Sequence, residues 1–333
     1  MKSPKISIIM ATYNSEKYLS KTVESILKQS FNDFEFIIIN DCSEDGTYNI
    51  LSKYNDKRIK VIDNNVNLGL YKSLNVGFKE SSGNFIARID ADDIASSNRL
   101  QVQYDYLINN PSIGLVGCNY YEIDKNGEKI SGLIKFHQDP IILKWRMSFE
   151  NPIPSPVLFR RDVYLKVGGF DERSKVGMDY DFFSKAIKFG KISNIQEPVM
   201  YWRVHDSSIS SSQGEFQLKN AKEVSRNYVN DILNEKFSLR EIDFLWERDK
   251  RIYNKIKFSI LYRIFRKILS EKEWSVKEKK KLKEYVVNYF IFHFKIHIKK
   301  PFIVALMLKT FFLSPVTYMN VVRRKIINFN YMD

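Results

Sequence analysis

Three carboxylates within four residues are the clearest chemical signal in this 333-residue sequence. Asp90, Asp92 and Asp93 directly follow the apolar run 85–89. Like charges this close together repel one another, so the segment needs a cation or strong hydrogen-bond donors beside it. Carboxylate oxygens suit Mg²⁺ or Mn²⁺, ions that usually also bind substrate phosphates. The pattern therefore predicts a divalent-metal site, although an acidic segment on its own is more often a solvated turn.

Two further polar clusters follow apolar runs earlier in the chain. Thr12, Tyr13 and Asn14 come after the run 6–10, and the polar segment 40–47, which contains Asp41, comes after the run 34–39. The carboxyl ends of parallel strands meet at one edge of a sheet, where ligands bind in such folds. We therefore expect all three clusters to lie close together, provided that the apolar runs are parallel strands.

The elements around these clusters support that arrangement. Short apolar runs at 6–10, 34–39, 59–62 and 85–89 read as strands covered on both faces. Helical spacing of apolar residues lies between them, at 19–27 with Ser15 as its expected N-cap, at 48–54 and at 70–78. Repeated strand–helix–strand order predicts an α/β fold with a doubly wound, mostly parallel sheet.

The later part of the chain changes in character. Helices are expected at 99–109 and 179–189, and strands at 115–121, 157–159 and 199–204. A serine-rich break at 206–214 then leads into a helical region rich in Lys, Tyr and Phe. We therefore predict two domains, a catalytic domain at 1–208 and a helical basic region at 209–333.

The basic charge of the protein belongs to the second of these domains. The net charge is +14, but residues 1–208 hold 27 basic and 26 acidic residues, whereas residues 209–333 hold 26 and 13. Such asymmetry indicates an anionic partner surface. Docking on a membrane through the basic, apolar segment 299–325 is the favoured interpretation. A helical cap or a homo-oligomer surface is the main alternative, and nucleic acid is the least favoured partner.

The cysteine content and the N-terminal residues indicate the cellular compartment in which the protein is expected to act. Two cysteines supply neither a disulfide framework nor a structural zinc site, which favours a reducing cytoplasm. The first residues do not read as a signal peptide, and every apolar stretch is too short to span a bilayer. We expect a cytoplasmic protein, peripheral on the inner face of the plasma membrane.

Eight short motifs follow one another along roughly residues 5–210. The motifs are Ser7–Asn14, Asn40–Thr47, Asn67–Asn75, Ile89–Ile94, Phe159–Arg161, Gly168–Asp171, Met178–Asp181 and Arg203–His205. Together they give the sequence a resemblance to the inverting glycosyltransferases of family 2, of the bacterial surface-polysaccharide type, which have the GT-A fold. A single motif would be weak evidence, but eight in the right order are strong evidence.

The resemblance implies roles at the nucleotide. Thr12, Tyr13 and Asn14 match positions at the nucleotide base, with Tyr13 as the stacking ring. Asp41 matches the carboxylate that accepts a hydrogen bond from the uracil N–H, which suits a group that only accepts. Lys72 matches a basic residue near the diphosphate or base.

The resemblance also implies a metal site. Asp92 would bind Mn²⁺ or Mg²⁺, and Asp90 would contact the ribose or a metal-bound water. His205 matches a histidine near the diphosphate or metal, although a lone histidine is often only a structural hydrogen-bonding residue. Asp93 is a secondary candidate at this site.

Asp179 matches the catalytic base of the family, which would take the proton of the acceptor hydroxyl. The family usually has Glu before this Asp, whereas this chain has Met178. A helix N-cap is the alternative role for Asp179, and Asp181 is the alternative base. The implied reaction moves a sugar from a UDP-sugar to a glycan or lipid-linked glycan, as in O-antigen, capsule or lipooligosaccharide synthesis.

Other interpretations remain open at this point. A sugar nucleotidyltransferase would need a glycine-rich, basic phosphate loop after the first strand, where this chain has Thr12 to Asn14. A non-catalytic nucleotide-sugar-binding protein would keep the fold without the reaction. The segment 145–161, with Trp145, either contacts the acceptor or forms a turn around a buried indole.

Overall fold

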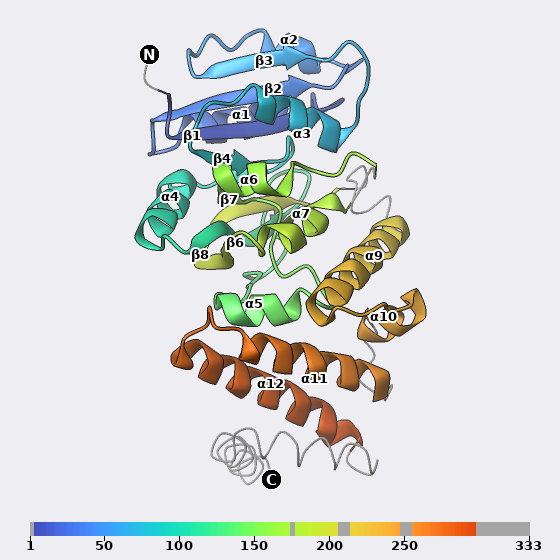
Figure 1. Cartoon of the computed structure of the whole chain (residues 1–333). Helices are drawn as coiled ribbons and strands as arrows, with labels where there is room; N and C mark the ends of the chain where they lie inside the picture. Colours follow the sequence, from blue (N-terminus) through green and yellow to red (C-terminus); the bar gives the residue numbers. More distant parts are fainter. Residues whose placement is uncertain (1–2, 174–176, 206–213, 247–254, 298–333) are drawn as a thin grey trace, which may run out of the picture. The chain divides into compact units, whose positions relative to one another are not determined.

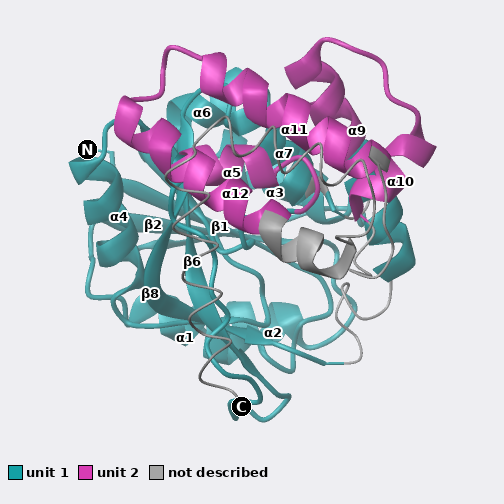
Figure 2. Ribbon diagram, turned by 90° about the horizontal axis from the view of Figure 1, so that it is seen from below, with its two compact units in different colours: residues 1–140, 151–224 teal, residues 141–150, 225–333 magenta. Residues whose placement is uncertain are grey.

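The computed structural model describes residues 3–173, 177–205, 214–246 and 255–297 (Figure 1). The chain divides into two compact units (Figure 2). Unit 1 comprises residues 1–140 and 151–224, and unit 2 comprises residues 141–150 and 225–333.

Unit 1 contains one eight-stranded sheet with the order β3-β2-β1-β4-β7-β6-β8-β5. The strands are β1 Ile6–Thr12, β2 Phe34–Asn40, β3 Ile59–Asp63, β4 Phe85–Arg88, β5 Ile94–Ala95, β6 Ile113–Ile123, β7 Leu158–Arg160 and β8 Lys191–Arg203. The predicted strands are therefore confirmed, whereas the two-residue strand β5 was not predicted because it is too short to show a pattern.

Strand direction brings the first two polar clusters together. β1 pairs in parallel with β2 and β4, and Thr12 lies opposite Asn40 in the β1–β2 register. β7 then runs antiparallel between β4 and β6, while β6 and β8 are again parallel. The sheet is therefore mixed, and its fully parallel part is β3-β2-β1-β4, which carries all three predicted polar clusters at its carboxyl ends.

The helices of unit 1 flank this sheet (Figure 1). They are α1 Leu19–Leu27, α2 Thr47–Leu51, α3 Leu70–Lys79, α4 Arg99–Asn109, α6 Arg161–Val167 and α7 Met178–Ala186, and α9 Gly214–Leu233 continues from unit 1 into unit 2. The expectation that Ser15 caps α1 is wrong. Its carbonyl accepts the backbone N–H groups of Tyr18 and Leu19, and its hydroxyl bonds to Tyr13, because a turn precedes the helix.

Helix α3 lies unusually close to the sheet. A Cβ atom at Gly77 would overlap the side chains of Ile39 on β2 and Ile9 on β1, so only glycine permits this approach. Gly69, just before the helix, has a φ of 85°, a left-handed conformation that glycine adopts without strain. Gly69 therefore sets where α3 begins and Gly77 sets how closely it packs on the sheet, and both affect where Lys72 lies.

Unit 2 is helical and has its own core. Its helices are most of α5 Pro140–Arg146, the second part of α9, α10 Leu239–Trp246, α11 Lys255–Ser270 and α12 Val276–His297. Trp145 is fully buried among Phe149, Tyr285 and Tyr289 and donates its indole N–H to the carbonyl of Leu261. The acceptor-contact interpretation of Trp145 is therefore wrong, because its ring and its only donor are both used inside this core.

Aromatic residues of the basic region serve the same core. Phe258, Phe265, Trp274 and Phe290 are all buried in it. None of the helices in the described part of the chain is both long and apolar enough to cross a membrane. The segment 299–325, on which the docking prediction rests, lies outside the described residues.

Candidate active site

The first two polar clusters form one continuous surface at the ends of β1 and β2. The backbone N–H of Asp41 donates to the carbonyl of Thr12 at 2.8 Å, and the backbone N–H of Glu44 donates to Asn14 Oδ1 at 2.8 Å. The hydroxyl oxygen of Thr12 is buried and has no hydrogen-bond partner among the described residues. Tyr13 is 47% exposed, so its ring is available for stacking.

The buried Asp41 carboxylate organises the loop that leads into α3. It accepts hydrogen bonds of 2.8 Å from the backbone N–H groups of Leu68 and Gly69 and from the side-chain amide of Asn64. A carboxylate offers about four acceptor positions, so these three bonds leave one position without a donor among the described residues. Lys72 follows in the first turn of α3 and is exposed.

Each carboxylate of the acidic segment has a different partner. Asp90 Oδ1 lies 2.8 Å from Nη2 of Arg88, and Asp92 Oδ2 lies 2.9 Å from Nε2 of His205. Asp93 Oδ1 accepts the backbone N–H of Arg203 at 2.9 Å. The repulsion expected from the sequence is thus reduced by three separate partners, two of which come from the end of β8 and the residues just beyond it.

Local electrostatics distinguish these carboxyl groups. Burial raises the pKa of Asp90 to about 6, with Asp92 and Asp179 adding to the effect and Arg88 opposing it. Burial, together with Asp92 and Asp90, also raises the pKa of Asp93 well above its usual range. Asp93 is only 1% exposed, so its carboxyl group braces β8 and offers no surface to a ligand.

Arg203, at the end of β8, contacts the segment that contains Asp92 and the Tyr18 ring that packs on His205. Arg203 is fully buried and donates from Nε to the carbonyl of Asp92 at 2.8 Å. The ring of Tyr18 packs against both the Arg203 guanidinium, at 4.6 Å, and the His205 ring, at 5.0 Å. On α1, the hydroxyl of Thr22 donates to the acidic segment's backbone carbonyls. The Asp92–His205 pair is therefore held by neighbours on two other elements.

Asp179 lies beside this acidic segment. Its Oδ2 is 2.9 Å from Nη1 of Arg88 and accepts the hydroxyl of Ser155 at 2.7 Å. Its Oδ1 is buried and has no hydrogen-bond partner among the described residues. Helix α7 begins at Met178 after Gly177, so Asp179 is in the first turn and is not the N-cap.

Asp181 is placed differently. Its carboxylate pairs with Lys185, one turn along α7, at 2.6 Å. Burial raises the pKa of Asp181, and Lys185 opposes that effect. Among the described residues, Asp181 therefore lies outside the ion-pair chain that joins Asp179 through Arg88 to Asp90.

Two residues of this site are not identified by sequence reasoning. Arg88 ends β4 only two positions before Asp90, and a buried-strand arginine this close to an acidic segment was a usable signal. Ser155 has no such signal, because its contact with Asp179 joins an irregular segment to helix α7 across 24 positions of the chain.

Comparison with known proteins gives the family. The model of the family "Glycosyl transferase family 2" matches residues 7–168. An uncharacterized glycosyltransferase of Haemophilus influenzae is 33% identical and aligns over 79% of this chain and 86% of its own length. The Escherichia coli O-antigen biosynthesis glycosyltransferase WbnJ is 32% identical over 62% of this chain and 82% of its own.

The fold is also shared with a solved structure. A crystal structure of Staphylococcus aureus TarS (residues 1–349) in complex with UDP-GlcNAc aligns with a TM-score of 0.58 at 22% identity, over 86% of this chain and 80% of that one. At this identity the likeness concerns the fold. Family match, relatives and fold agree, and this chain belongs to glycosyl transferase family 2 and has the GT-A fold.

Proposed function

We propose that this glycosyltransferase moves a sugar from a UDP-sugar to a hydroxyl group of a glycan or lipid-linked glycan, with inversion at the anomeric carbon. The ion-pair chain Asp90–Arg88–Asp179 carries the proposal, because it joins the acidic segment to a buried carboxylate with an unpartnered oxygen. Family membership favours glycosyl transfer over the nucleotidyltransferase and non-catalytic alternatives.

The nucleotide would bind at the ends of β1 and β2. Tyr13 is exposed for stacking, and the Asp41 carboxylate retains an acceptor position for the uracil N–H. Asn14 and Thr12 shape the same surface, and Lys72 would face the diphosphate. TarS, which shares the fold, was crystallised in complex with UDP-GlcNAc, and this ligand is compatible with the proposed donor class.

The residues present fit a divalent metal. Asp92 and His205 bring a carboxylate oxygen and an imidazole nitrogen to within 2.9 Å of each other. In the part of the chain that the structure describes, no three His, Cys, Asp or Glu side chains gather as a metal site. Such metals are commonly bound by one or two protein groups plus substrate phosphates and water. When bound, Mn²⁺ or Mg²⁺ would offset the negative charge of the departing diphosphate.

The chain's own residues would perform the transfer as one displacement. Asp179 Oδ1 takes the proton of the acceptor hydroxyl while the oxygen of that hydroxyl forms the bond to C1 of the sugar. The bond from C1 to the diphosphate oxygen breaks, and its electron pair leaves with UDP. Attack opposite the leaving group inverts C1. Lys72 would stabilise the charge on UDP.

A donor screen tests the function. The full-length protein with MnCl₂ is incubated with UDP-sugars and, for comparison, GDP-sugars, and release of the nucleoside diphosphate is measured. We expect slow release from one UDP-sugar and none from the GDP-sugars. Release from a GDP-sugar alone would contradict the role given to Asp41.

The acceptor and the site of action are part of the same proposal. WbnJ is named for O-antigen biosynthesis, which supports a bacterial surface glycan as the acceptor class. The net charge of residues 209–333, from 26 basic and 13 acidic residues, supports action at the anionic inner surface of the plasma membrane.

Vesicle binding tests the docking proposal. Reversing Lys299, Lys300 and Lys309 to Glu should weaken partitioning onto vesicles containing phosphatidylglycerol by at least about 100-fold, since each nearby basic residue contributes roughly 1 kcal/mol. Sedimentation with vesicles at low salt measures this. A control reverses three exposed lysines of unit 1: Lys53, Lys57 and Lys79. If the unmodified protein does not bind these vesicles at low salt, the docking proposal is wrong.

A further inference from the structure

Arg88 is a buried cation between two carboxylates. Its side chain is 5% exposed, with Nη2 2.8 Å from Asp90 Oδ1 and Nη1 2.9 Å from Asp179 Oδ2. The planar guanidinium can serve two carboxylates from fixed positions, which a lysine ammonium cannot do with the same geometry. Arg88 therefore sets the position of Asp179 relative to the acidic segment.

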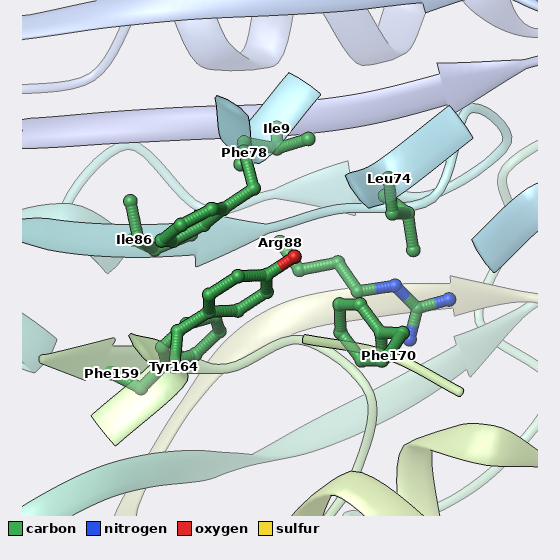
Figure 3. Close-up of a pocket in the computed structure, with 8 residues that line it drawn as sticks. All are labelled: Ile9, Leu74, Phe78, Ile86, Arg88, Phe159, Tyr164 and Phe170. Atoms are coloured by element: carbon green, nitrogen blue, oxygen red, sulfur yellow. The ribbon is translucent and has the colours of Figure 1, made fainter. Parts of the chain in front are cut away.

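The fold holds Arg88 itself firmly. Its aliphatic chain lines an apolar pocket with Leu74, Phe78 and Phe170, and the guanidinium extends past the Phe170 ring (Figure 3). Its backbone N–H donates to the carbonyl of Val157, and its carbonyl accepts the buried Arg99 guanidinium at 2.6 Å. The cation consequently has little freedom to follow a moving carboxylate.

Ser155 contacts the same oxygen of Asp179. Its hydroxyl donates to Oδ2 at 2.7 Å, so Oδ2 has both a hydrogen bond and an ion pair, whereas the buried Oδ1 has no partner among the described residues. A buried acceptor without a donor is costly in a folded protein, and a ligand hydroxyl would relieve that cost. The contacts on Oδ2 oppose rotation of the carboxylate and select Oδ1 as the oxygen left for a ligand.

We infer that Arg88 and Ser155 are positioning residues that lock the Asp179 carboxylate so that Oδ1 meets the acceptor hydroxyl. This inference rests on the proposed function, in which Asp179 is the base. Neither residue touches the reacting atoms. Their effect is on orientation, and an error of about 1 Å in a reacting group can cost about 100-fold in rate.

Replacing Ser155 tests the inference with little risk to folding. We expect Ser155→Ala to lower kcat about tenfold with the KM for UDP-sugar unchanged, because one of two contacts on Oδ2 is lost while the donor site is intact. Ser155→Thr keeps the hydroxyl and should recover most of that loss. The matched control is Ser193→Ala, which removes a buried hydroxyl of the same unit that contacts Tyr106 and Gln138 instead.

Replacing Arg88 should have a larger effect of the same kind. Arg88→Lys keeps the positive charge but loses the planar guanidinium whose two nitrogens contact Asp90 and Asp179. We expect kcat to fall about 100-fold with a much smaller change in donor KM. Added methylguanidinium should partly restore kcat in Arg88→Ala. Thermal unfolding followed by circular dichroism establishes that each variant is folded. If the Arg88 variants do not fold, the Ser155 pair decides the question.

The Asp179→Asn variant distinguishes the proposal that Asp179 is the base from the inference that Arg88 and Ser155 position it. If Asp179→Asn is inactive while Ser155→Ala keeps the kcat of the unmodified protein, Asp179 remains the base and the positioning inference is overturned. A fully active Asp179→Asn variant refutes the base assignment, and the proposed mechanism fails with it. A drop in kcat for Ser155→Ala that Ser155→Thr does not recover also overturns the inference, because the hydroxyl would then not be the cause.

Discussion

Transfer by the Asp179→Asn variant should fall by about 100- to 10,000-fold, the range typical for loss of a general base. The amide has the shape of the carboxylate but cannot take up the proton of the acceptor hydroxyl. Asn can still contact Arg88 and Ser155, which bind Oδ2 in the native protein. We therefore expect a folded variant whose loss lies in kcat, measured as glycoside formed under saturating donor.

Binding of UDP should survive this substitution. Tyr13, Asp41 and Lys72, which are proposed to bind the uracil base and the diphosphate of UDP, are unchanged in this variant. Calorimetry of UDP with Mn²⁺ should therefore give a similar Kd. A large loss of UDP binding would show that Asp179 acts on the nucleotide and would remove it from the role of base.

Asp181→Asn is the matched control on the same helix. Asp181 pairs with Lys185, and burial already raises the pKa of its carboxyl group, so a neutral amide should be tolerated there. We expect activity within a few-fold of the unmodified protein, since the Asp181–Lys185 pair lies outside the ion-pair chain of Asp90, Arg88 and Asp179. The opposite result, with Asp181→Asn inactive and Asp179→Asn active, would move the base to Asp181.

The second large effect concerns the metal. Asp92→Ala should lower transfer by at least about 100-fold, comparable to losing a group that offsets transition-state charge. Mn²⁺ should strengthen UDP binding to the unmodified protein and have little effect in the variant, because the carboxylate that pairs with His205 is gone. Calorimetry with and without MnCl₂, and activity after treatment with EDTA, measure both consequences.

Two further variants complete that experiment: one at His205, the second proposed ligand, and one at a carboxylate remote from the site as a control. His205→Gln removes the second proposed ligand and should also weaken the Mn²⁺ effect. Asp105→Ala, at an exposed position of α4, should leave it unchanged. If the Mn²⁺ dependence of Asp92→Ala equals that of the unmodified protein, Asp92 is not a metal ligand.

The N-terminal half of unit 1 was predictable because its signals are local. Continuous apolar runs mark strands buried on both faces, and helical spacing marks the segments between them, so β1 to β4 and the helices between them follow from neighbouring residues alone. The polar residues after each run also follow. Elements with weak local signals, such as α5 and β5, did not emerge in this way.

The assignment of partners within the acidic segment was not predictable. Asp90, Asp92 and Asp93 are nearly equivalent in sequence, yet one pairs with an arginine, one with a histidine and one with a backbone N–H. Two of these partners, His205 and Arg203, are more than a hundred residues away. Sequence spacing carries no information about such contacts, because they depend on how β8 returns beside β5 and β6.

The same distinction applies to the basic charge and the aromatic residues. Charge and motif order are properties of the chain, so they could be read without a structure: the charge lies in the last third, and the family motifs lie before it. That Trp145 and Phe290 are core residues, and that Arg88 and Ser155 both contact Asp179, became evident only in the folded protein. The physical reason is that burial and ion pairing arise between segments distant in the chain, where no local pattern constrains them.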